Sequence, residues 1–279
     1  MMVPARSSFA GEPSNSAWPA AARRPRARLR SRGLQSWYWR RELIVNLTRT
    51  REHGAEQDTR RRLRMVAKAT ALAGGLGFLV GVLLHPARDG AGIAAVGQTY
   101  GITHGLEAIG LLLVAVSLVS VYALDAERFG RSGVPAFLTA VVGTLLWFGL
   151  IAVDGTRNPV TAKYAPDIVH TTADLDAGAG IISLPALLVF PVGYVLLALL
   201  LTRYQIKWPG LLVGIGAVVY WSGSIPLFFL GPKSPLSQVL EVAGAVPFAL
   251  GFVLLGRRWG QAEPQLDHPA SSTHQPTGR

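Results

Sequence analysis

Apolar residues run through the chain in six long stretches that are separated by short polar segments. Each stretch holds about 20 residues, the length that a helix needs to cross roughly 30 Å of hydrocarbon. Each is predicted to be a helix, because an isolated strand would leave backbone polar groups unpaired in lipid. The predicted spans are Met65–His85, Ile102–Leu124, Val134–Asp154, Ala179–Thr202, Trp208–Leu230 and Ser237–Gly256. The sequence therefore predicts an all-α fold, a polytopic membrane helix bundle with six transmembrane helices.

The composition agrees with this pattern. Half of the 279 residues are hydrophobic and 15% are charged, whereas a soluble domain carries about 25% charged residues. The chain has no cysteine, which excludes disulfides, thiolate zinc sites and cysteine nucleophiles.

Positive charges in the short loops predict the orientation, since cytoplasmic loops are enriched in lysine and arginine. One side of the predicted bundle holds, besides the arginine-rich start of the chain, Arg128, Arg131, Arg203, Lys207, Arg257 and Arg258. The other side holds Arg88, Arg157, Lys163 and Lys233 mixed with Asp89, Asp167, Asp174 and Asp176. The first side is predicted to be cytoplasmic, which places both termini in the cytoplasm of a multi-pass cell-membrane protein.

Three regions are predicted along the chain: a basic, mostly disordered cytoplasmic arm (1–64), the six-helix domain (65–256) and a disordered cytoplasmic tail (257–279). The arm holds 15 of the 27 basic residues, and it explains the net charge of +11. Its arginines favour contact with anionic lipid. A partner-free solvated arm is an alternative, as is a mis-assigned start with translation beginning at Met65. The expected partner is the lipid bilayer, and no nucleic acid is expected.

Prolines inside the predicted helices indicate kinks, because proline removes a backbone hydrogen bond. They are Pro185, Pro191, Pro226 and Pro247. Spans three and five also share a spacing. Proline is followed at identical intervals by tryptophan, glycine and isoleucine, in the sets Pro135, Trp147, Gly149, Ile151 and Pro209, Trp221, Gly223, Ile225. This spacing suggests a parallel internal repeat, as some transporters have.

Ionisable residues in membrane spans are rare and often functional. In the predicted orientation they gather at the outward ends of the helices. The candidate ligand or metal residues are His85, His104, Glu107, Asp154 and Glu241, with His170 and Asp174 from the longest outer loop. His104 and Glu107 share a helix face, and His170 and Asp174 do so if a helix starts at Pro166.

Three histidines with carboxylates suit zinc, with an open position for an activated water. Such a site would make a membrane hydrolase with Glu107 or Asp154 as general base. His85 and His104 could instead hold a b-type haem as axial ligands. A polar outer rim without a ligand is the simplest alternative, since water and lipid headgroups reach this depth. A pocket for a small molecule or a lipid, in a hydrophobic groove between kinked helices, is a further alternative.

The stretch Gly77 to Pro86 (GFLVGVLLHP) and the stretch Thr103 to Leu112 (THGLEAIGLL) resemble uncharacterised small multi-pass membrane proteins of high-GC bacteria. The resemblance implies a membrane location. The first functional hypothesis is a ligand-binding or accessory membrane component with a polar histidine and acid cluster at its outward face. The alternatives are a zinc-dependent membrane hydrolase, a b-haem electron-transfer protein and a permease-like carrier.

Overall fold

The computed structural model describes residues 31–86, 88–169 and 177–261, and in these ranges the chain is helical with no strand. The elements are α1 (Ser31–Leu83), α2 (Gly90–Val96), α3 (Gln98–Tyr164), the 3₁₀ turn η1 (Pro166–Ile168), α4 (Ala177–Arg203), α5 (Lys207–Ser222), α6 (Ser224–Leu230) and α7 (Pro235–Gly260). The chain divides into two units, 1–55 and 56–279. Of the first unit, the structure describes residues 31–55, which belong to α1. Residues 1–30 and 262–279, in the arm and tail predicted to be disordered, lie outside the described residues. Residues 31–64, which belong to the arm predicted to be mostly disordered, are helical in α1.

Five helices in the described ranges are long and apolar enough to cross a membrane, which indicates a multi-pass membrane protein. Their outer faces carry large apolar side chains that a soluble protein would bury, among them Leu188 (66% exposed), Leu199 (64%) and Ile215 (57%). This exposed surface is explained if lipid covers it.

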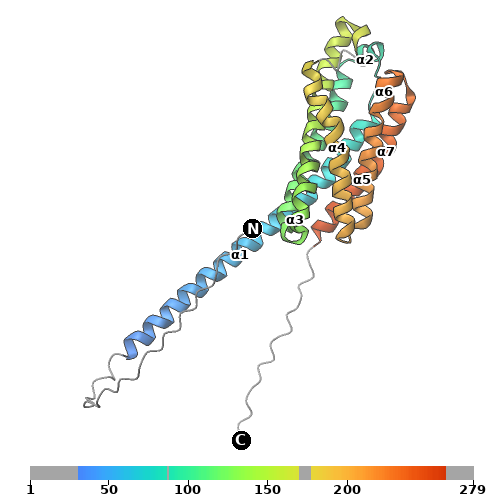
Figure 1. Cartoon of the computed structure of the whole chain (residues 1–279). Helices are drawn as coiled ribbons and strands as arrows, with labels where there is room; N and C mark the ends of the chain where they lie inside the picture. The colour runs from blue at the N-terminus through green and yellow to red at the C-terminus, as the bar shows by residue number, and fades with distance from the viewer. Residues whose placement is uncertain (1–30, 87, 170–176, 262–279) are drawn as a thin grey trace, which may run out of the picture. The chain divides into compact units, whose positions relative to one another are not determined.

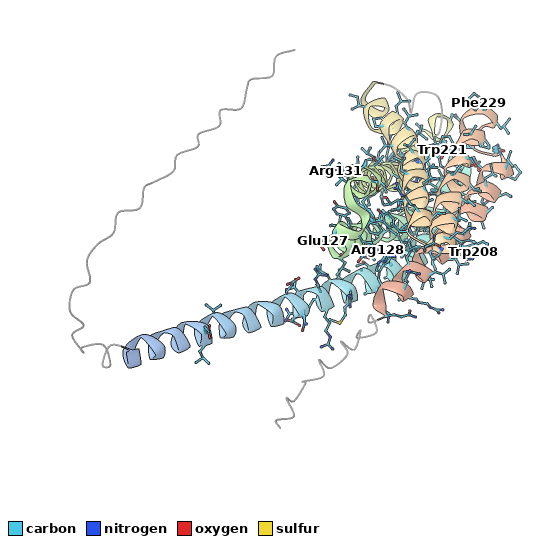
Figure 2. All side chains as sticks on the ribbon, turned by 60° about the horizontal axis from the view of Figure 1, so that its bottom comes forward. Glu127, Arg128, Arg131, Trp208, Trp221 and Phe229 are labelled. Carbon is cyan, nitrogen blue, oxygen red and sulfur yellow. The ribbon has the colours of Figure 1, made fainter. Side chains whose placement is uncertain are left out.

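Helix α3 has 67 residues and would be about 100 Å long if it were straight. Its backbone leaves the helical conformation at Asp125 and at Gly130, where φ is +53°. Glycine adopts this left-handed conformation without the steric cost that a side chain brings. The chain reverses there, because His104 in the first half of α3 contacts Asp154 in the second half. Figure 2 shows Glu127, Arg128 and Arg131 at this turn.

The second unit is a bundle in which α3, α4, α5 and α7 run beside one another, and the part of α1 that belongs to this unit packs among them (Figure 1). The predicted kink at Pro226 is a break at Gly223 between α5 and α6, three residues before the proline. Proline cannot bond to the carbonyl four residues earlier, which explains a break at this place. The other predicted kink positions, Pro185, Pro191 and Pro247, lie inside helices.

The aromatic core lies between α1, α3, α4, α5 and α7. Phe78, Tyr220 and Phe248 meet edge to face, with ring centroids of Phe78 and Tyr220 4.8 Å apart and those of Phe78 and Phe248 5.2 Å apart. Trp147 and Phe190 stack beside them at 4.9 Å. Offset and edge-to-face contacts of this kind stabilise aromatic pairs beyond the area that they bury. This core forms the floor of the polar cluster described next.

Candidate functional site

Polar side chains that are far apart in sequence meet at one end of the bundle. His85 follows the last turn of α1, and His104 and Glu107 lie in the first turns after the start of α3. Asp154 lies in the returning half of α3, and Glu241 lies near the start of α7. His85, His104, Glu107 and Glu241 are all less than 7% exposed. These positions form a buried cluster rather than a polar surface.

His85, His104 and Asp154 form the first part of the cluster. The Nε2 atoms of the two imidazoles are 3.3 Å apart, and Asp154 Oδ2 is 2.9 Å from His104 Nε2. The ring of His104 stacks on that of Tyr100 at a centroid distance of 4.2 Å, which fixes its plane. Tyr100 also donates a hydrogen bond from its hydroxyl to Asp154 Oδ2 (3.0 Å). Asn158 donates to the other carboxylate oxygen.

The backbone determines where the protons of these two histidines lie. His85 Nδ1 is 2.7 Å from the carbonyl oxygen of Pro86, and His104 Nδ1 is 2.9 Å from that of Tyr100. A carbonyl oxygen can only accept, so each Nδ1 carries a proton and donates it. In a neutral imidazole the other nitrogen, Nε2, then presents a lone pair. His104 Nε2, however, lies beside two acceptors, His85 Nε2 at 3.3 Å and Asp154 Oδ2 at 2.9 Å, and the same argument gives it a proton to donate to them.

Such an arrangement requires a positive species among the three atoms, either one further proton or a metal ion. Because His85 donates its Nδ1 proton to the carbonyl of Pro86, the neutral form of this imidazole presents the Nε2 lone pair. A backbone carbonyl that accepts from the far nitrogen is also the usual partner of a metal-binding histidine.

Arg88 and Glu241 form the second part of the cluster. Their side chains make a buried ion pair, with 16% and 6% exposed surface. Burial is the largest single influence on the pKa of Arg88 and lowers it, but the charge of Glu241 and those of the other acidic groups nearby together outweigh burial, and the pKa lies above its ordinary value. Gln238, one turn before Glu241, donates to the backbone carbonyl of His85 (3.4 Å). The ion pair and the Gln238 hydrogen bond both join α7 to the segment that connects α1 and α2.

Glu107 faces the aromatic core. Its Oε2 accepts a hydrogen bond from the hydroxyl of Tyr220 (3.4 Å), and that hydroxyl accepts from the indole of Trp147 (3.4 Å). Glu107 Oε1 is buried without a hydrogen-bond partner. A buried acceptor left unpaired costs about 1–3 kcal/mol, so its retention calls for a reason beyond packing.

Five of the seven residues expected from the sequence, His85, His104, Glu107, Asp154 and Glu241, lie in this cluster. The other two, His170 and Asp174, lie outside the described residues. Among the residues that the structure describes, no three histidine or acidic side chains form a complete set of metal ligands. The histidine pair is two such ligands, and Asp154 contacts one member of the pair.

The sequence analysis missed Arg88, Tyr100, Asn158 and Tyr220. Tyr100 lies four residues before His104 and Asn158 four residues after Asp154, so helical spacing could have revealed these two. Arg88 counted only as a loop charge, and no local pattern connects it with a residue 153 positions later.

No protein-family model, no curated protein and no solved structure matches the chain.

Proposed function

We propose that the chain crosses the cell membrane six times, with both termini in the cytoplasm. Two observations support this topology. The chain reverses within α3 at residues 125–130, so each half of α3 is long enough for one crossing. The basic residues at this reversal, Arg128 and Arg131, lie on the side that the positive-inside rule assigns to the cytoplasm. In this orientation the buried polar cluster lies near the outer surface.

Labelling of single cysteines tests this topology, since the natural chain has no cysteine. A membrane-impermeant maleimide is expected to label Tyr164→Cys in intact cells. It is expected to label Ser132→Cys and Gln261→Cys only after permeabilisation. Tyr164 is 75% exposed and Ser132 and Gln261 are exposed as well, so folding does not hide these positions. Labelling of Ser132→Cys in intact cells would contradict the six-pass arrangement.

For the cluster, we propose that the protein binds a transition-metal ion of the zinc class through His85 and His104. The observation that carries this proposal is the approach of the two Nε2 atoms to 3.3 Å. Two nitrogens that bind one tetrahedral zinc at about 2.0–2.1 Å are about 3.3 Å apart. Asp154 supplies the third ligand after a small shift of its side chain, which is 29% exposed. Water would complete the coordination.

A b-type haem is less compatible with this geometry. Axial imidazoles bind iron from opposite faces of the porphyrin, which holds their nitrogens about 4 Å apart with the macrocycle between them. Here the ring centroids of His85 and His104 are only 4.6 Å apart, and the rings meet edge to face. A porphyrin would require both side chains to move apart.

A membrane hydrolase is the second candidate function, and the unpaired Oε1 of Glu107 favours it. Glu107 lies three residues after His104 on one helix face, and a carboxylate beside a metal-bound water would act as its general base.

Zinc titration of the purified full-length protein in mild detergent tests metal binding. We expect about one zinc ion bound per chain and about one proton released, because metal displaces the proton among the three donors. Calorimetry in buffers of different ionisation enthalpy counts that proton. Thr144→Val, which removes a buried hydroxyl that contacts Tyr194 at 2.7 Å, is the control and should bind zinc normally. A folded protein that binds no zinc would refute the proposal.

A further inference from the structure

Two helical hairpins in the bundle have matching contacts. The end of α1 and the start of α3 form the first, and α5 and the start of α7 form the second. A Cβ atom at Gly81 would lie 2.5 Å from Glu107 Cγ and 2.9 Å from the carbonyl oxygen of Thr103. A Cβ atom at Gly223 would lie 2.5 Å from Glu241 Cγ and 2.9 Å from the carbonyl oxygen of Ser237. In both hairpins a glycine thus packs on a buried glutamate and on the residue one turn before that glutamate.

The match continues along both hairpins. Seven residues before these glycines, Gly74 and Gly216 each would place a Cβ atom 2.8 Å from the carbonyl oxygen of a glycine on the other helix. Those partners, Gly110 and Gly244, each follow the buried glutamate by three residues. Close approach of two helices through glycines is a common membrane contact, but its repetition at identical intervals around two glutamates is specific.

The sequences agree with this correspondence. The pairs at matching positions are Thr103 and Ser237, Leu106 and Leu240, Glu107 and Glu241, Gly110 and Gly244, and Ala115 and Ala249. The repeat predicted between spans three and five lacks such shared contacts. Gly149 has open space around it, whereas Gly223 packs on Glu241. The structure thus relates the first hairpin to the last one, which the proline and tryptophan spacing did not indicate.

The two hairpins differ at the positions that contribute to the polar cluster. His104 of the first hairpin corresponds to Gln238 of the second, and Glu107 corresponds to Glu241. Gln238 and Glu241 both contact the connection that carries His85, since Gln238 donates to the His85 carbonyl and Glu241 pairs with Arg88. The first hairpin therefore supplies His104. In the second hairpin, the corresponding residues Gln238 and Glu241 contact the segment that carries His85.

From this division we infer that the chain contains two copies of one hairpin, and that Gln238 and Glu241 of the second copy position His85 for metal binding. The inference about metal rests on the proposed function, whereas the inference about position does not. Glu241 and Arg88 do not touch the metal, and they act by fixing His85 opposite His104. Residues that orient metal ligands typically change affinity by about 10–100-fold when they are replaced.

A distance measurement tests the positioning without metal. Leu84→Cys and Val134→Cys in one chain place spin labels beside His85 and at the far end of the bundle, on side chains 60% and 48% exposed. In this background we expect a narrow distance distribution, and Glu241→Gln should broaden it by releasing the connection. Glu241→Asp, which keeps the charge, should broaden it less, and Thr144→Val should leave it unchanged.

Zinc affinity is measured on the same variants without the cysteines. Glu241→Gln is expected to weaken zinc binding by at least about tenfold. Gln238→Leu, which removes a single contact and leaves the ion pair intact, should give a smaller change of the same sign. An unchanged distance distribution in Glu241→Gln would overturn the inference. Broadening in a protein whose parent binds no zinc would support the positioning role and refute the metal proposal instead.

Discussion

Replacing His104 by glutamine is expected to weaken zinc binding by at least about 100-fold while the protein stays folded. Glutamine fills much of the same volume and can donate to the carbonyl of Tyr100, the present partner of His104 Nδ1 at 2.9 Å. It cannot present a nitrogen lone pair towards His85, so the pair of ligands is lost. A competition titration against a zinc-chelating dye measures the affinity, and size-exclusion chromatography verifies the fold.

His85→Gln should have the same effect as His104→Gln, because the two imidazoles are proposed to share one ion. His53→Gln is the comparison, since His53 lies on α1 in the first of the two units. Equal zinc affinity in His104→Gln and the parent protein would show that any bound metal lies elsewhere.

Replacing Arg88 by methionine is expected to cost about 3–5 kcal/mol of stability, because it leaves the buried carboxylate of Glu241 without its cation. For a chain of this size the loss corresponds to a fall in the unfolding temperature of about 10 °C. The pair is buried on both sides, with 16% and 6% exposed surface, so solvent screens it little. Thermal unfolding in mild detergent, followed by circular dichroism, measures the change.

The double variant Arg88→Met with Glu241→Met gives the decisive comparison. Removing both partners eliminates the unpaired charge, and apolar replacements of a buried ion pair are often neutral or stabilising. The double variant should therefore be more stable than Arg88→Met alone. Equal destabilisation in the single and double variants would mean that the loss arises from packing around Arg88 and not from its charge.

In the proposed site the two parts of the cluster have different roles: one binds the ligand, and the other holds His85 in position. His85 and Asp154 both approach His104 Nε2. Arg88, Gln238 and Glu241 make the contacts between α7 and the segment that carries His85. Glu107 belongs to neither group and contacts Tyr220. Its unpaired oxygen makes it the position at which a reaction, beyond binding, would be sought first.

The sequence alone predicted the helices and the identity of most candidate ligands. Whether a segment such as Ala179–Thr202 is apolar over a membrane-length stretch is a local property, and α4 spans Ala177–Arg203. The sequence also indicated that the acids and histidines collect at helix ends. It indicated an irregularity in the fifth predicted span through Pro226, and the structure has the break at Gly223, between α5 and α6.

Only the tertiary structure decided which of these residues meet. The contacts His85 with His104, His104 with Asp154, and Arg88 with Glu241 join residues 19, 50 and 153 positions apart. No local pattern contains such pairs, because they arise from the way that α1, α3 and α7 pack. The correspondence between the two hairpins was hidden for the same reason. Few residues are identical at matching positions, but the glycine contacts that bring the helices together are similar in both hairpins. The length of the apolar stretches and the positions of the charges predicted the membrane helices. Close packing of these helices determined which polar side chains meet between them.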